Sequence, residues 1–196
     1  MKLQLNPDWT EFLSLLISKR VRFVLVGGHA VAAHGEPRLT EDLDVFIDPT
    51  LANAARLREA LLAFGFGSDV PSVRELVVPG SIWMLGRKPW RIDVLNQIDG
   101  VSFARAWSGR AKADFRAGPL FLIGRKDLIA NKRASGRDRD LRDVAMLEAM
   151  TSARASRTRR LRRHSRHRRH GTCDRRRHCP DDGVSALAAR AKSRLR

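Results

Sequence analysis

Residues 23–47 read FVLVGGHAVAAHGEPRLTEDLDVFI, and this stretch decides the fold. Its short, partly β-branched start at 23–26 predicts a buried strand that ends at Gly27-Gly28. The alanine-rich residues after the glycines predict a helix, 35–41 predicts a polar loop, and 42–48 predicts a second strand. A glycine pair at this turn lets the backbone approach a phosphate, which the N-terminus of the helix then faces.

The second strand carries an acidic pair. Asp42 and Asp44 are two residues apart, so both side chains project from the same face, about 6–7 Å apart along the backbone. Carboxylate oxygens are the ligands that Mg²⁺ prefers, and it is commonly shared with substrate phosphates. The spacing therefore predicts that these two carboxylates bind Mg²⁺.

A two-metal site, with ions about 3.5–4 Å apart, normally needs a third carboxylate. Asp93 lies in the otherwise apolar stretch WRIDVL, where a charge is costly unless it is paired or bound to metal. We expect Asp93 to bind metal and to help deprotonate an attacking hydroxyl. The alternative is an ordinary ion pair with Arg91 or Arg87.

The rest of the chain mixes the two kinds of periodicity. This predicts an α/β or α+β fold, in which helices flank a small mixed sheet and the last two helices close over the site. The expected helices cover 8–19, 29–35, 51–66, 102–110, 124–135 and 138–150, and the expected strands after residue 70 lie within 73–80, 81–86, 89–95 and 111–123.

Composition changes abruptly after Met150. The formal net charge is +17, but residues 151–196 contain 15 Arg, one Lys and three Asp and so carry +13, whereas residues 1–150 carry +4. We expect a domain over 1–150 and a disordered basic tail over 151–196, because the tail lacks hydrophobic periodicity. Three interpretations of the tail stay open: phosphate binding to RNA or DNA, no specific role, or translation of a shifted reading frame.

The cysteine count and the N-terminus favour a cytoplasmic location. Cys173 and Cys179 both lie in the tail, so no disulfide framework is expected in the body, and their spacing with the nearby histidines matches no standard zinc finger. The chain starts without the apolar run of a signal peptide and has no stretch of about 20 apolar residues. The sequence therefore predicts no membrane association.

The order of these motifs resembles the nucleotidyltransferase superfamily related to DNA polymerase beta. It is more closely similar to the small bacterial branch of AbiEii-type toxins and minimal nucleotidyltransferases of toxin–antitoxin systems. The resemblance covers about residues 20–150 and rests on the glycine pair, the Asp-x-Asp and the later acid, with a lead-in of Arg38 and Thr40. One departure is Gly28-His29, where the superfamily often has Gly-Ser, so a serine hydroxyl contact to phosphate is absent.

The resemblance implies a nucleotidyltransferase fold and a Mg²⁺-dependent transfer from an NTP. Asp42, Asp44 and Asp93 would form a two-metal site. Lys132 would add positive charge at the nucleotide, and the acids Asp140 and Asp143 would carry the family's later motifs. Asp140 is alternatively a residue that holds Lys132 or Arg137 in place. Around the nucleotide the resemblance and the helix start place Gly27, Gly28, His29, Arg38 and Thr40.

The acceptor is not fixed by the sequence. By resemblance it is a hydroxyl of RNA, such as a tRNA 3′ end, or of a protein, and a cognate toxin or antitoxin is an expected partner. Two other hypotheses stay open. The chain is alternatively a catalytically silent, antitoxin-like protein that binds a partner, or a nucleic-acid-binding protein that acts through its tail.

Overall fold

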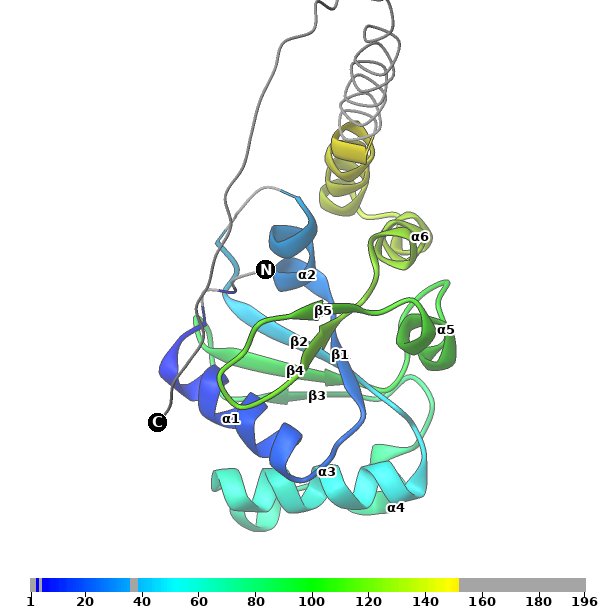
Figure 1. Ribbon diagram of the computed structural model, residues 1–196. Coiled ribbons are helices and arrows are strands. Elements are labelled where there is room, and N and C mark those ends of the chain that lie inside the picture. The colour runs from blue at the N-terminus through cyan, green and yellow to red at the C-terminus, as the bar shows by residue number, and fades with distance from the viewer. Residues whose placement is uncertain (1–2, 4, 36–38, 152–196) are drawn as a thin grey trace, which may run out of the picture. The chain divides into compact units, whose positions relative to one another are not determined.

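The structure is a computed structural model that describes residue 3, residues 5–35 and residues 39–151. Arg38, predicted to lie near the nucleotide, and the predicted tail beyond Thr151 lie outside the described residues. Helices and strands alternate along the chain, as Figure 1 shows. The helices are α1 (Pro7–Ser18), α2 (Gly27–His34), α3 (Leu51–Phe64), α4 (Val73–Leu76), α5 (Phe103–Ser108) and α6 (Arg125–Ser135), with a 3₁₀ turn at Gly67–Asp69 and a further helical stretch over 138–151.

The strands form one six-stranded mixed sheet in the order β3-β4-β2-β1-β6-β5. At the centre of the sheet, β2 pairs with β1 in antiparallel orientation and with β4 in parallel orientation. β1 and β6 are also parallel. The prediction of a mixed sheet flanked by helices is therefore confirmed. The strands are β1 (Phe23–Leu25), β2 (Asp42–Ile47), β3 (Ile82–Leu85), β4 (Arg91–Leu95), β5 (Ala111–Ala113) and β6 (Leu120–Leu122).

The predicted alternation along β2 separates the core from the site. Leu43, Val45 and Ile47 are fully buried on one face of the strand. Asp42 and Asp44 are half-buried on the other face, where a residue-by-residue alternation places them. Burial of the apolar face fixes the orientation of the strand, since a one-residue slip would put both carboxylates into the core.

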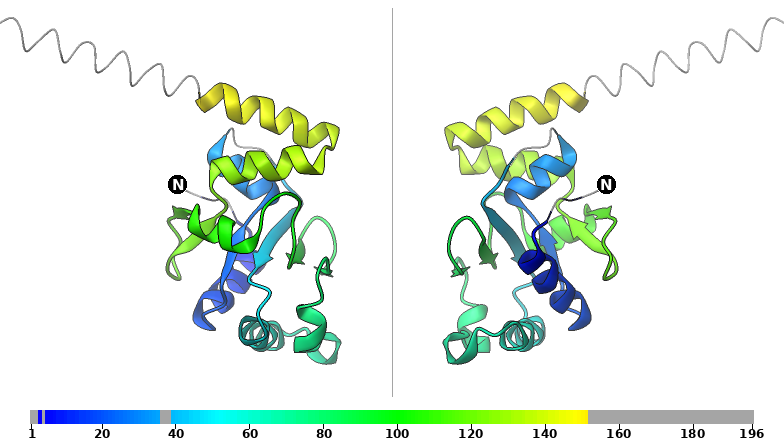
Figure 2. Two further views of the ribbon diagram at one scale, coloured as in Figure 1. Left: turned by 90° about the vertical axis from the view of Figure 1, so that its right-hand side faces the viewer. Right: turned by 90° about the vertical axis from the view of Figure 1, so that its left-hand side faces the viewer.

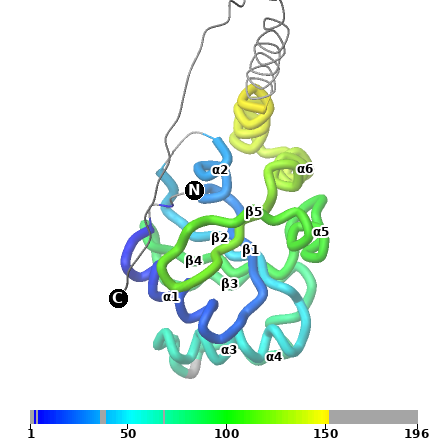
Figure 3. Tube along the Cα trace, viewed as in Figure 1, coloured from blue at the N-terminus to red at the C-terminus, as the bar shows by residue number. Residues whose placement is uncertain are grey.

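The helices lie at both ends of the sheet. In Figures 1 and 2, α2 and α6 lie above it and α3 and α4 below it. The tube in Figure 3 follows β1 directly into α2. The main chain explains this grouping: β1 and β6 run in parallel, so the turns that open α2 and α6 leave the same end of the sheet, where the Ile123 N–H donates to the Leu25 carbonyl at 2.9 Å. Both helix starts therefore lie beside the N-terminal end of β2.

The segment 73–80 was predicted as a strand, and this prediction is wrong. It begins with α4, because Ser72 and Glu75 form a reciprocal capping box in which each side chain accepts a hydrogen bond from the other's backbone N–H. Local hydrogen bonds of this kind favour a helix start over a strand whatever the β-branched content.

Among the described residues, no helix has the length and apolar character needed to cross a membrane.

Candidate active site

The parallel pairing of β2 with β4 brings the predicted acids together. The register places Asp44 opposite Asp93 and Asp42 opposite Arg91. Directly opposed residues project from the same face of a sheet, so all three carboxylates share one face. Asp93 is 8% exposed, which makes it one of the few buried charged residues of the described chain.

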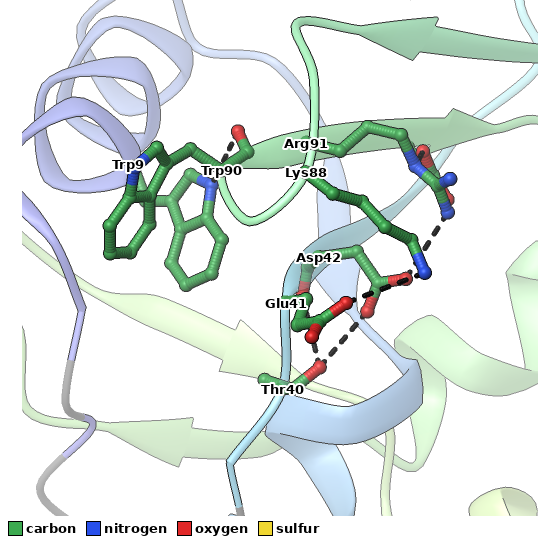
Figure 4. Close-up of polar contacts among 8 residues, drawn as sticks. Trp9, Thr40, Glu41, Asp42, Lys88, Trp90 and Arg91 are labelled. Atoms are coloured by element: carbon green, nitrogen blue, oxygen red, sulfur yellow. Dashed lines mark hydrogen bonds and ion pairs between the residues drawn. The ribbon is translucent and has the colours of Figure 1, made fainter.

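Arg91 contacts two of these carboxylates, and Figure 4 shows its guanidinium close to Asp42. Its Nε donates to Asp93 Oδ1 and its Nη2 to Asp93 Oδ2, both at 2.7 Å. The same Nη2 donates to Asp42 Oδ2 at 3.2 Å. The hydrogen bond with Asp93 and the surrounding carboxylates hold the pKa of Arg91 above its ordinary value. Asp93 therefore forms an ion pair with Arg91, and its predicted role at a metal stays a prediction.

Of the three carboxylates, Asp44 forms no hydrogen bond or ion pair with Arg91 in the described part of the chain. Its pKa is raised to about 6, mainly by burial and then by the negative charges of Asp42 and Asp93. A hydrogen bond from the Gly28 backbone and the charge of Lys132 lower it in part. Asp44 is thus a crowded, partly desolvated carboxylate that a further cation would stabilise in its ionised form.

Gly27 and Gly28, predicted as a turn before the helix, are the first two residues of α2 and follow β1 closely. Gly27 has a positive φ of 56°, and a Cβ at this position would overlap Asp44 Oδ2. A Cβ at Gly28 would overlap the Thr40 hydroxyl. The absence of both side chains lets the start of α2 lie directly against the carboxylates. Val26 at the N-cap position provides no side-chain cap, but the Gly28 N–H donates to Asp44.

Thr40 and His29, both predicted to lie near the nucleotide, contact other side chains of the protein. The Thr40 hydroxyl donates to Asp42 Oδ1 at 3.0 Å, so Thr40 holds a carboxylate in place. His29 is 5% exposed and lies edge-on to Trp9, with ring centroids 5.1 Å apart. Burial lowers its pKa to about 4, although the charge of Asp42 opposes this, so the ring is neutral at neutral pH.

Lys132 is a buried residue of α6. Its Nζ donates to Asp140 Oδ1 at 2.5 Å and lies 2.8 Å from Asp143 Oδ2, both in the helix over 138–151. Burial acts to raise the pKa of Asp140, but hydrogen bonds from Lys132 and Ser135 and the charges of Lys132 and Arg137 hold it below its ordinary value. The alternative in which Asp140 holds Lys132 in place is confirmed.

A cleft of about 380 Å³ connects the two groups of charges. Its floor includes Gly27 and Asp44, and its wall on the α6 side includes Lys132. Further polar side chains line this cleft, and the sequence assigned none of them a role in it, because a single sequence does not show which distant segments face one cleft. The polar residues are Gln97, Asp99, Asn131, Ser135 and Arg137, and the apolar residues beside them are Ile82, Leu95 and Ile98.

The donors of the acidic cluster suit a hard divalent cation. Burial and then the charges of Asp42 and Asp93 raise the pKa of Asp44, and a cation between the three carboxylates would relieve the repulsion among them. Within the described ranges, however, no group of three or more His, Cys, Asp or Glu side chains is arranged to hold a metal ion. Arg91 contacts oxygens of both Asp42 and Asp93.

The acids, the glycine turn and Lys132 thus come together as the sequence predicted, while Arg91 adds a cation that the prediction treated only as an alternative partner. The charge pattern could have revealed it, since Arg91 is two residues before Asp93 and so shares its face of β4.

Compared with known proteins, the chain matches no protein-family model, and no curated protein is significantly similar to it.

Proposed function

We propose that this protein is a Mg²⁺-dependent nucleotidyltransferase with the nucleotidyltransferase fold, which transfers a nucleotidyl group from an NTP to a hydroxyl of RNA or protein. The observation that carries the proposal is the register that sets Asp44 opposite Asp93 beside the N-terminus of α2. Carboxylates next to a helix N-terminus provide a site for cations and phosphates together.

Each part of the site has a role in this reaction. Asp42, Asp44 and Asp93 would hold the divalent cation, which supplies neutralisation of the triphosphate charge and orientation of the α-phosphate. The backbone N–H groups at Gly27-Gly28 would hold phosphate oxygens. Lys132, in the opposite wall of the cleft, would contribute its positive field. Catalysis of this kind is mainly positioning and charge stabilisation, so few side chains are required.

The proposed step is a substitution at phosphorus. The acceptor oxygen forms a bond to the α-phosphorus of the NTP, the bond from that phosphorus to the bridging oxygen breaks, and pyrophosphate leaves. The proton of the acceptor hydroxyl passes to a carboxylate of the site. Asp93 serves as this base only when Arg91 no longer donates to both of its oxygens.

The test is label transfer from each α-labelled NTP with Mg²⁺, offered total tRNA and, separately, a protein extract. We expect Asp44→Asn to lower transfer by at least about a hundredfold, the size of loss seen when one charge-stabilising group is removed from an active site. Glu41→Gln is the matched control: it removes a neighbouring carboxylate that is exposed and that pairs with Lys88 at 3.4 Å, outside the acidic cluster. Glu41→Gln should leave transfer unchanged.

A second candidate function is favoured by Arg91 itself. A guanidinium bound to two of the three carboxylates is also what a catalytically silent, partner-binding protein of this fold would retain. Transfer that survives Asp44→Asn would refute the proposed site. Failure of the wild-type protein to label any RNA or protein, with every NTP, would favour the silent alternative.

A further inference from the structure

Arg91 is the charged residue of the site to which the proposed reaction assigns no part. It engages both oxygens of Asp93 and one of Asp42, through the planar fork that suits arginine to carboxylates. The remaining Asp42 oxygen, Oδ1, accepts from Thr40. Every carboxylate oxygen of Asp42 and Asp93 therefore already has a donor.

These are the oxygens that a divalent cation would need. Each carboxylate oxygen has a second lone pair, but a guanidinium and a metal ion on the same oxygens repel each other, and both are attracted by the same negative charge. The Arg91 side chain is 24% exposed, so it can move toward solvent without passing through the core. Loss of the Arg91 contacts with Asp42 and Asp93 is thus coupled to gain of metal contacts by the same carboxylates.

We propose that Arg91 is an internal counter-ion that competes with the divalent cation for Asp42 and Asp93, so that it holds the carboxylates together before metal binds and must release them when metal binds. This inference rests on the proposed function, because it assumes that the carboxylates bind metal. It adds a regulatory feature to the site. The affinity for metal then depends on how strongly Arg91 binds the same carboxylates, and not on the carboxylates alone.

A neighbouring ion pair provides the matched control. Lys88 lies three residues before Arg91 and pairs with Glu41 at 3.4 Å, also across the ends of β4 and β2 (Figure 4). Its side chain is 58% exposed, and in the described part of the chain it forms no hydrogen bond or ion pair with Asp42, Asp44 or Asp93. Lys88→Gln removes the same unit of charge from the same region without freeing a carboxylate of the site.

The experiment measures Mn²⁺ binding to the full chain without nucleotide, by calorimetry and by the spectrum of free Mn²⁺ in electron paramagnetic resonance. We expect Arg91→Gln to lower the Kd for Mn²⁺ by at least about fivefold, the lower end of common couplings between two ligands. Lys88→Gln should change it by less than about twofold, as expected for an exposed charge. Arg91→Lys, which keeps the charge but lacks the planar fork, should give an intermediate Kd.

Thermal unfolding supplies a second measurement. Without Arg91 the three carboxylates repel one another, so the Tm of Arg91→Gln in EDTA should fall below that of the wild-type protein, and Mn²⁺ should raise it by more than it raises the wild-type Tm. If Arg91→Gln does not fold in EDTA, the comparison of Arg91→Lys with the wild-type protein still decides the question.

Two results would overturn the proposal and separate it from the proposed function. If Arg91→Gln and Arg91→Lys bind Mn²⁺ no more tightly than the wild-type protein, while Asp44→Asn abolishes binding, the competition is wrong and the metal site remains. If neither the wild-type protein nor the Arg91 variants bind Mn²⁺, both the competition and the metal-dependent function are wrong.

Discussion

Gly27 is the residue at which the turn and the carboxylates are most tightly joined. Its positive φ disfavours any residue with a Cβ, and its missing side chain leaves room for Asp44. We expect Gly27→Ala to lower the free energy of unfolding by about 2–4 kcal/mol, since strain and overlap both contribute. The measurement is urea-induced unfolding, followed by Mn²⁺ binding of the folded variant.

Gly136 is the matched control for this substitution. It ends α6 with a positive φ of 67°, and a Cβ there would have no heavy atom within 4 Å. Gly136→Ala should therefore show the backbone strain alone, about 1–2 kcal/mol, with unchanged Mn²⁺ binding. Equal losses for the two variants would show that overlap with Asp44 does not matter.

His29 makes stability depend on pH. Its pKa is lowered to about 4 in the folded protein, mainly by burial, whereas in an unfolded chain it titrates near 6.5. The unfolded state therefore takes up the proton first, and stability present above pH 6.5 is lost as pH falls toward 4. We expect the wild-type protein to lose about 1–2 kcal/mol relative to His29→Gln between pH 7 and pH 5.

The comparison with His29→Gln is needed because Asp44 acts in the opposite direction. Its pKa is raised to about 6, so its contribution to stability grows as pH falls from 6 toward 4, in both proteins alike. Urea-induced unfolding of both proteins at several pH values isolates the histidine. A difference between them that stays constant with pH would contradict the assignment of a neutral, buried ring.

At the scale of elements, α6 and the helix over 138–151 are joined through a buried charge. Lys132 reaches two carboxylates of the following helix at 2.5 and 2.8 Å, and its side chain is 6% exposed. We expect Lys132→Met to lower the free energy of unfolding by about 3–5 kcal/mol, since it leaves buried carboxylates without this cation. Addition of Asp140→Asn should restore part of the loss, as measured by urea-induced unfolding.

Lys126 offers a control on the same helix, because its side chain is exposed. Lys126→Met should change stability by no more than about 0.5 kcal/mol. If Lys132→Met were as stable as Lys126→Met, the ion pairs of Lys132 would not join the two helices. In the proposed reaction Lys132 would therefore shape the cleft through these ion pairs as well as supply charge.

For the whole molecule, the positive charge and the candidate site belong to different parts of the chain. Residues 151–196 carry +13 of the net +17, whereas the buried apolar residues of the described chain extend from Trp9 to Leu147. We expect deletion of 152–196 to leave the Tm unchanged and to weaken binding of unstructured RNA, with a shallower dependence on salt. RNA affinity at low salt that survives the deletion would exclude the segment from nucleic-acid binding.

The sequence by itself determined the local parts of this protein. The alternation of Asp42 and Asp44 with apolar residues fixed which face of β2 is buried, and the glycine pair fixed where the strand turns into a helix. Both follow from periodicity and backbone freedom, which act over a few residues. Even so, the capping box at Ser72 overrode the β-branched residues after it, because a local hydrogen bond competes at the same range.

The tertiary structure alone decided how the charges combine. Parallel pairing set Asp93 opposite Asp44 across 49 residues of sequence, and the same register placed Arg91 between Asp42 and Asp93. Burial turned Lys132 from a surface cation into a partner of Asp140 and Asp143. The physical reason is that the energy of a charge depends on its distance to other charges and on the water around it, and neither is known until the chain is folded.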